Sequence, residues 1–180
     1  MWQDIIIAVW FFLPAGAANM APIFAAKLPG LRRWSTPLDL GFTYKGIRLF
    51  GDHKTWRGLL SGILLGIFVA LLQQIMVGHF NFPEAVAVTT PTLLLGGLLG
   101  FGALAGDAAK SFFKRRLGRR PGDSWLPFDQ LDYIAGGIVL TIPFFRLSLE
   151  QYIWLCIVWS GLHIVVSYAG FLLRLKGKPI

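Results

Sequence analysis

The chain has 180 residues, of which 55% are hydrophobic and 14% are charged, and its formal net charge is +8. Together with a mean hydropathy of +0.61, this composition excludes a soluble or peripheral protein and indicates an integral membrane protein. The only cysteine, Cys156, excludes an intramolecular disulfide and a metal site built from several cysteines.

Apolar stretches close to 20 residues long, the length that crosses a bilayer, occur five times. We therefore predict an all-α integral membrane protein with a single membrane domain, 1–180, and five transmembrane helices. The first stretch has no basic segment before it and has Asp4 near its start, so we expect it to be retained rather than cleaved as a signal. The predicted spans are about 5–26, 59–77, 92–110, 131–146 and 149–172.

Basic residues are distributed very unevenly among the connections. Seven lysines and arginines lie in 27–57, six in 110–127 and three after Leu173, but none in 78–91 and only Arg146 before the last span. Sixteen of the seventeen therefore fall on one side. The positive-inside rule then predicts a cell-membrane protein with its N-terminus outside and its C-terminus and both basic loops in the cytoplasm. Topology explains the net charge better than a nucleic-acid partner, which we do not expect.

Span one carries Asn19 and Pro22 near its cytoplasmic end. A proline frees a backbone carbonyl and an asparagine both donates and accepts hydrogen bonds, so this pair suits the lining of a polar cavity. A hydrogen bond from Asn19 to a neighbouring helix would explain it equally well.

The first cytoplasmic loop leads into span two through Gly51-Asp-His-Lys-Thr-Trp-Arg-Gly58. Asp52 and Thr55 have side-chain oxygens that can cap the start of the helix. Lys54, Thr55 and Arg57 bring two cations and a hydroxyl to a helix N-terminus, which suits anionic oxygens such as those of a phosphate. The alternative is a capped helix flanked by topological positive charge.

Glycines recur at four-residue spacing in spans two and three. This spacing predicts smooth helix faces that allow close packing. The residues are Gly58, Gly62, Gly66, Gly96 and Gly100.

Span three ends in Asp107, Lys110, Ser111 and Lys114. Their separations of three, four and seven residues predict that they share one face of the helix. On that face a carboxylate would meet a hydroxyl and two ammonium groups.

Two further carboxylates, Asp129 and Asp132, share a face at the start of span four. Like charges so close repel each other unless a cation or a proton lies between them. An all-oxygen set without histidine at ligand spacing fits magnesium better than zinc. We therefore predict that Asp107, Asp129 and Asp132 bind Mg²⁺, with helix capping and snorkelling as the alternative.

The loop between spans three and four contains Arg119 and Arg120, followed by Pro121 and Gly122. Glycine and proline favour defined bends here, and the two guanidinium groups are suited to phosphate binding.

Taken together, these motifs resemble the CDP-archaeol synthase family over nearly the whole chain. The second block is also similar to the end of the larger CDP-diacylglycerol synthases, but Gln130 stands where they carry arginine. The matching motifs are Asn19-x-x-Pro22, Thr36-Pro-Leu-Asp39, Gly51-Asp-His-Lys-Thr-x-Arg57-Gly58, Gly106-Asp107-x-x-Lys-Ser111-x-x-Lys114-Arg115, and Asp129-Gln-x-Asp132.

The resemblance implies a CTP-dependent lipid-phosphate cytidylyltransferase. It would transfer CMP from CTP to 2,3-bis-O-geranylgeranylglycerol 1-phosphate, an archaetidic acid, and form CDP-archaeol and pyrophosphate. We expect Asp107, Asp129, Asp132 and Lys114 to be catalytic. The expected substrate-binding residues are Asn19, Asp39, Asp52, Lys54, Thr55, Arg57, Ser111, Arg115, Arg119 and Arg120, of which Asn19 and Asp39 would read cytosine or hold the first loop.

A small membrane ion or proton transporter is the alternative from another class, because carboxylates within a membrane also mark ion paths. Such transporters often have inverted repeats and place their charges near the midplane, and this sequence shows neither feature. The partners we expect are CTP and a lipid phosphate in the bilayer; the sequence makes no prediction of the oligomeric state.

Overall fold

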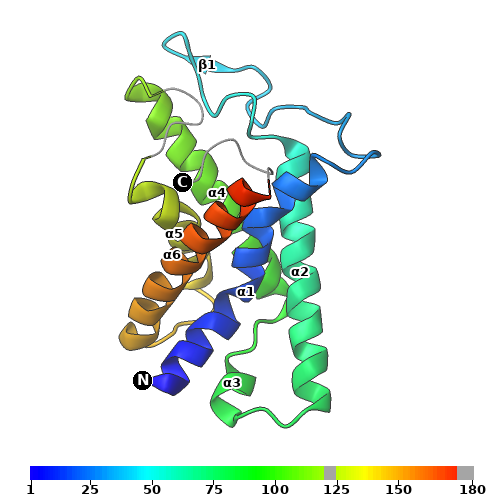
Figure 1. Ribbon diagram of the computed structural model, residues 1–180, viewed down its shortest axis with the longest axis vertical. Helices are drawn as coiled ribbons and strands as arrows, with labels where there is room; N and C mark the ends of the chain where they lie inside the picture. Colours follow the sequence, from blue (N-terminus) through cyan, green and yellow to red (C-terminus); the bar gives the residue numbers. More distant parts are fainter. Residues whose placement is uncertain (120–124, 174–180) are drawn as a thin grey trace.

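The computed structural model describes residues 1–119 and 125–173, and the chain forms six helices and one small hairpin within them (Figure 1). The elements are α1 (Trp2–Ala25), β1 (Thr43–Tyr44), β2 (Ile47–Arg48), α2 (Trp56–His79), α3 (Glu84–Val88), α4 (Leu93–Arg116), α5 (Phe128–Thr141) and α6 (Leu149–Leu172).

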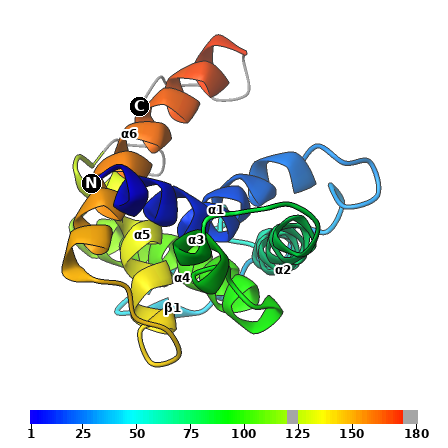
Figure 2. The ribbon, with the colours of Figure 1, turned by 90° about the horizontal axis from the view of Figure 1, so that it is seen from below.

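The long helices alternate in direction between two ends of a bundle (Figure 1). One end carries the hairpin and the connections after α1 and α4, and we call it the loop end. The opposite end carries the N-terminus, α3 and the turn between α5 and α6. Seen along the bundle, α6 leads away from the other helices towards its C-terminal end (Figure 2).

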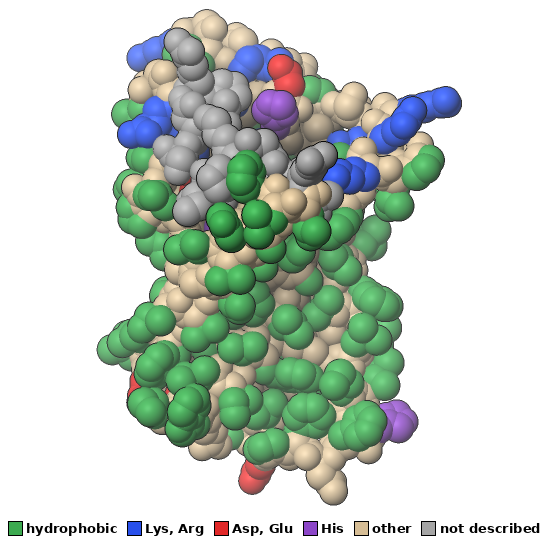
Figure 3. Space-filling model, viewed as in Figure 1, with side chains coloured by type: hydrophobic (Ala, Val, Ile, Leu, Met, Phe, Trp, Pro, Cys, Tyr) green, Lys and Arg blue, Asp and Glu red, His purple; other side chains and the backbone are tan. Residues whose placement is uncertain are grey.

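Within residues 1–119 and 125–173, four helices, α1, α2, α4 and α6, are long and apolar enough to cross a membrane. The expectation of an all-helical membrane protein is therefore confirmed. Hydrophobic side chains cover the visible face of the bundle, whereas lysine and arginine side chains gather at the loop end (Figure 3). The predicted span 131–146 corresponds to α5, whose 14 residues extend about 21 Å, less than a typical hydrocarbon core of about 30 Å. The count of five spans therefore stays a prediction.

The hydrophobic core lies where α1 meets α4, α5 and α6. Phe12 is completely buried and contacts the rings of Tyr133 and Trp159, with centroids 6.0 and 5.6 Å away. The Tyr133 hydroxyl donates a hydrogen bond to the Trp159 carbonyl at 2.8 Å, so the polar end of this aromatic group is satisfied. This packing joins α5 and α6 through α1.

Glycine allows α4 and α5 to approach at backbone distance. A Cβ atom on Gly136 would lie 2.1 Å from the carbonyl oxygen of Gly102, and one on Gly106 would lie 2.1 Å from that of Asp132. Between α2 and α4, a Cβ on Gly66 would lie 2.5 Å from the carbonyl oxygen of Gly96. The close packing predicted from glycine spacing is therefore present, because no side chain fits at these crossings.

The hairpin of β1 and β2 is a small addition to the helical fold that the sequence analysis did not predict. Its two central residues, Lys45 and Gly46, have φ values of 53° and 76°, as in the two-residue turns that match the twist of paired strands. The strands are only two residues long, so no alternation of polar and apolar residues marks them in the sequence.

Candidate active site

Three lysine ammonium groups and three aspartate carboxylates meet at the loop end. Lys110 lies at their centre: its Nζ is 3.2 Å from Asp107 Oδ1, 2.9 Å from Asp129 Oδ1 and 2.5 Å from Asp132 Oδ2. Lys54 pairs with Asp107, and Lys114 Nζ is 2.8 Å from Asp129 Oδ1. We call these six residues the acid–lysine cluster.

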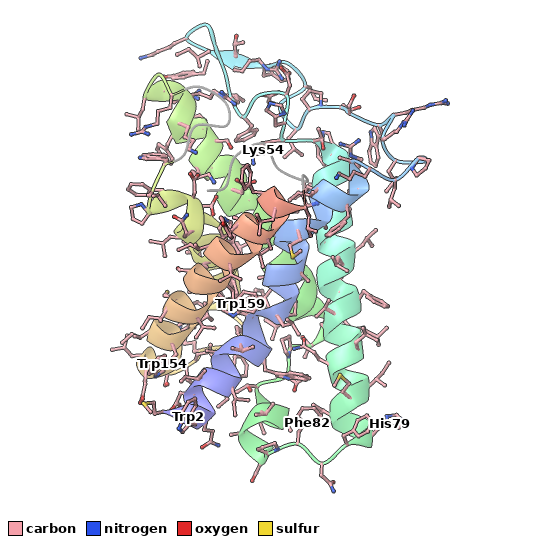
Figure 4. All side chains as sticks on the ribbon, in the orientation of Figure 1. Trp2, Lys54, His79, Phe82, Trp154 and Trp159 are labelled. Atoms are coloured by element: carbon pink, nitrogen blue, oxygen red, sulfur yellow. The ribbon has the colours of Figure 1, made fainter. Side chains whose placement is uncertain are left out.

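Three separate segments build the cluster. Asp107, Lys110 and Lys114 share one face of α4, as their spacing predicts, and the glycine contacts bring the start of α5 beside them. Lys54 comes from the loop that precedes α2, and Figure 4 shows it at the loop end, far from Trp2 and His79 at the opposite end. Residues separated by more than 70 positions thus share one charged centre.

The six side chains are only 6% to 23% exposed. Removing such charges from water is costly unless each one has a partner of opposite sign. Here three negative and three positive groups alternate, so every carboxylate contacts at least one ammonium group. The cluster can therefore exist beside the apolar bundle without a net charge of its own.

Lys110 was missing from the expected site residues, although its three-residue separation from Asp107 is visible in the sequence. The convergence on Lys110 shows that oxygens of three carboxylates can surround one cation within 3.2 Å. Their all-oxygen chemistry fits Mg²⁺. In the described part of the chain, no three acidic, histidine or cysteine side chains are arranged so that they could hold a metal ion as they lie. Lysine ammonium groups lie between the three carboxylates instead.

Asp39 anchors the first loop. Its fully buried carboxylate accepts hydrogen bonds from the backbone N–H groups of Gly41, Phe50 and Gly51, and it pairs with Arg48 at 2.5 Å. Burial alone would raise the pKa of Asp39, but the Arg48 guanidinium and the three N–H groups hold it well below its usual range. Of the two roles expected for Asp39, this geometry favours holding the loop.

The anchored loop carries Lys54 towards the cluster. The N–H group of Leu38, next to Asp39, donates to the carbonyl of Lys54 at 2.7 Å. Gly51 packs against Arg115 of α4, since a Cβ there would lie 2.9 Å from a guanidinium nitrogen. The loop thus packs against α4, and its C-terminal end leads directly into α2.

The structure separates the residues of the Gly51–Gly58 motif into different roles. Thr55 caps α2, with its hydroxyl oxygen accepting from Gly58 N at 3.2 Å. Asp52 is 78% exposed and pairs with Arg48 at 2.9 Å. Arg57 donates to the carbonyls of Leu31 and Arg32, each at 3.1 Å, so it holds the chain after α1. Only Lys54 of this motif joins the cluster.

The remaining expected residues are Ser111, Arg119, Arg120 and Asn19. Ser111 donates to the carbonyl of Asp107 at 3.0 Å within α4, and the Arg119 guanidinium lies 5.5 Å from the ring of Trp125. Arg120 lies outside the described residues. Asn19 lines a cavity of about 290 Å³ between α1 and α6, together with His163 and Ser167, but most of the lining residues are apolar.

A larger groove of about 640 Å³ opens between α4 and α5. Its walls are almost entirely apolar, and Lys110 and Asp132 of the cluster belong to its lining. The charged centre is therefore in direct contact with a surface suited to hydrocarbon chains.

Known proteins share this architecture. Residues 1–180 match the family described as "CarS-like: CDP-archaeol synthase". The CDP-archaeol synthase of Thermococcus onnurineus is 35% identical over 98% of both chains, and that of Methanoculleus marisnigri is 38% identical over 93% of this chain and 99% of its own. The solved structure reported as "Structural insight into an intramembrane enzyme for archaeal membrane lipids biosynthesis" superposes with a TM-score of 0.71 at 31% identity, covering 88% of this chain and 91% of that one.

We predict that Asp39→Asn loosens the first loop, because an amide cannot replace the charge paired with Arg48 and accepts fewer hydrogen bonds. Tryptic cleavage at Lys45 and Arg48 in detergent should become about 10- to 100-fold faster. Asp52→Asn is the matched control, since it removes an exposed partner of the same arginine and should change cleavage little. In the wild type, the low pKa of Asp39 keeps the anchor charged at neutral pH, so the cleavage rate reports the loop with its anchor intact. Equal cleavage of the two variants would refute the anchoring role.

Proposed function

The chain belongs to the CDP-archaeol synthase family, and from this membership and the geometry of its acid–lysine cluster we propose how its residues act. The family's reaction makes the protein a nucleotidyltransferase, which moves CMP from CTP to a lipid phosphate and forms CDP-archaeol. Because the curated relatives carry this name, we take the acceptor to be the geranylgeranyl diether of glycerol 1-phosphate.

The main observation that supports the proposal is that three lysines and three carboxylates lie together beside an apolar groove. A lipid phosphate oxygen attacks the α-phosphorus of CTP; a new P–O bond forms and the bond to the bridging oxygen breaks, so pyrophosphate leaves. The attacking phosphate is already ionised, so the reaction needs charge neutralisation and alignment more than a general base. Lys54, Lys110 and Lys114 supply positive charge where these phosphates would meet.

Asp107, Asp129 and Asp132 would hold Mg²⁺. When bound, the ion would neutralise charge on the triphosphate and on the departing pyrophosphate. In the arrangement described here, Lys110 keeps the three carboxylates together, since they would otherwise repel one another. With a divalent cation held by the three carboxylates, the ammonium groups of Lys54, Lys110 and Lys114 would be available to phosphate oxygens.

Further contacts to substrate would come from the edges of the cluster. Arg115, attached to the loop through Gly51, and Arg119, near Trp125, would bind phosphates, with Arg120 continuing the same basic segment. Ser111 and Thr55 would add hydroxyl groups if they exchange their present hydrogen bonds. Arg57 is not included, because it already holds two backbone carbonyls.

A membrane transporter is not favoured. The carboxylates are paired with lysines at one end of the bundle instead of standing alone near its middle, and the relatives are synthases.

The activity itself can be tested with purified protein, labelled CTP, Mg²⁺ and the geranylgeranyl diether phosphate. We expect a CDP-activated lipid and an equal amount of pyrophosphate, with ATP and GTP used poorly because a pocket that fits a pyrimidine leaves little room for a purine. Absence of pyrophosphate release, or equal turnover with ATP, would refute the cytidylyl-transfer assignment.

The metal site makes a sharper prediction. Asp107→Asn and Asp129→Asn keep the side-chain size but remove the charge that the cation needs, so each should lower turnover by about 100-fold or more. Lys114→Met should also lower turnover but keep the dependence on Mg²⁺. Pyrophosphate release measured against Mg²⁺ concentration separates these effects.

Glu84→Gln, an exposed carboxylate at the opposite end, is the control for charge loss alone. The two aspartate variants should still fold, because Lys110 retains two other carboxylates, and thermal unfolding in detergent checks this. Folded variants that turn over at the wild-type rate would exclude Asp107 and Asp129 as metal ligands.

We also propose that α5 spans the membrane as well, so that the chain crosses it five times. The loop end and its active site would then lie in the cytoplasm, and the N-terminus outside. The alternation of helix directions and the sixteen basic residues on one side support this orientation. Cysteines introduced at Asn81 and Arg119 in a Cys156→Ser background should then react with an impermeant reagent from opposite faces of a sealed membrane, Asn81 from outside. Labelling of both from the same face would contradict the five-span topology.

A further inference from the structure

Gln130 is a buried polar residue to which the proposed phosphate chemistry assigns no role. It lies in the first turn of α5, between Asp129 and Asp132, and is only 3% exposed. Its side-chain oxygen, Oε1, is buried and has no hydrogen-bond partner. A buried acceptor without a donor destabilises the fold, and such groups are uncommon in native proteins. A donor that arrives with a substrate would account for it.

The two substrates differ in the donors they can offer. An ionised diether phosphate has phosphate and ether oxygens, which are acceptors. CTP has an exocyclic amine on its base, and UTP has a carbonyl oxygen at the same position. An enzyme that uses CTP and rejects UTP therefore needs an acceptor placed for that amine, since sites built around a hydrogen bond discriminate strongly against the analogue that lacks it.

Among the described residues, only two buried side-chain acceptors lack a partner, Gln130 Oε1 and Gln73 Oε1; the other unpaired buried atoms are arginine nitrogens. Gln73 is 18 residues beyond Thr55 on α2, about 27 Å along the helix, and its Nε2 donates to the Trp10 carbonyl at 2.6 Å. Trp10 in turn bonds Thr90, on the connection before α4. Gln73 is thus part of a network remote from the cluster, whereas Gln130 directly follows Asp129 of the cluster in the first turn of α5.

We propose that Gln130 selects the nucleotide by accepting a hydrogen bond from the exocyclic amine of cytosine through Oε1. The proposal rests on the proposed function, because it assumes CTP as the substrate. The backbone of Gln130 is held by its N–H bond to the Pro127 carbonyl at 3.1 Å, which fixes the start of the side chain. UTP has no donor at that position, so Oε1 would stay without a partner.

The test compares kcat/KM for CTP, UTP and dCTP in the wild type and in Gln130→Leu. The substitution should lower the value for CTP by about 10- to 100-fold and leave that for UTP unchanged or higher, so that the preference for CTP over UTP collapses. The ratio of CTP to dCTP should stay constant. A changed CTP-to-dCTP ratio with an intact preference over UTP would mean that Gln130 contacts the ribose, and would overturn the proposal.

Gln73→Leu is the matched control, because it removes the other buried unpaired amide oxygen. It should leave the CTP-to-UTP ratio at the wild-type value even if the protein unfolds at a lower temperature. If Gln130→Leu does not fold, Gln130→Asn keeps the amide, withdraws its oxygen by one methylene group and should show the same collapse. An unchanged ratio in the folded Gln130 variant, or a collapse in Asn19→Ala instead, would refute the role of Gln130.

Failure of this inference is distinguishable from failure of the proposed function. Wild-type protein that does not release pyrophosphate from CTP contradicts the function itself. Wild-type protein that does so, with Gln130 variants of unchanged selectivity, contradicts only the assignment of Gln130.

Discussion

Ionised groups beside an apolar bundle must neutralise one another, and the loop end of this protein is organised around that constraint. Lys110 contacts three carboxylates from two helices, and Lys54 and Lys114 complete the balance. Each pairing offsets part of the cost of withdrawing charge from water. Without Lys110, three carboxylates would lie together at the edge of the bundle with too little positive charge to hold them.

The packing of α4 against α5 sets the spacing of the cluster. A Cβ on Gly106 would collide with the backbone of Asp132, so the absence of a side chain at Gly106 determines how closely Asp132 lies to α4. The close packing of the two helices therefore also sets the distances within the acid–lysine cluster. This explains why the cluster lies at a crossing of small residues, where helices approach most closely.

Much of the polar chemistry of the first loop serves to position one residue. Asp39 ties the loop to itself, Arg57 holds the chain that follows α1, and Thr55 begins α2. Each satisfies buried or terminal backbone groups that would otherwise lack partners. Together they place Lys54 against Asp107. Lys54 is the residue that the loop contributes to the acid–lysine cluster. The geometry of the acid–lysine cluster therefore depends on a loop that is itself held by buried hydrogen bonds.

The sequence by itself determined the membrane class, the helices, the charge asymmetry and the shared face of Asp107, Lys110 and Lys114, because hydropathy and helical periodicity are local properties of a chain. Its motifs also led to the family. Only the tertiary structure decided that Lys110 is central, that Asp39 and Arg57 hold loops, and that Gln130 has an unpaired oxygen. These facts depend on distances between residues far apart in sequence, and on which hydrogen bonds are already occupied, and neither is encoded in spacing along the chain.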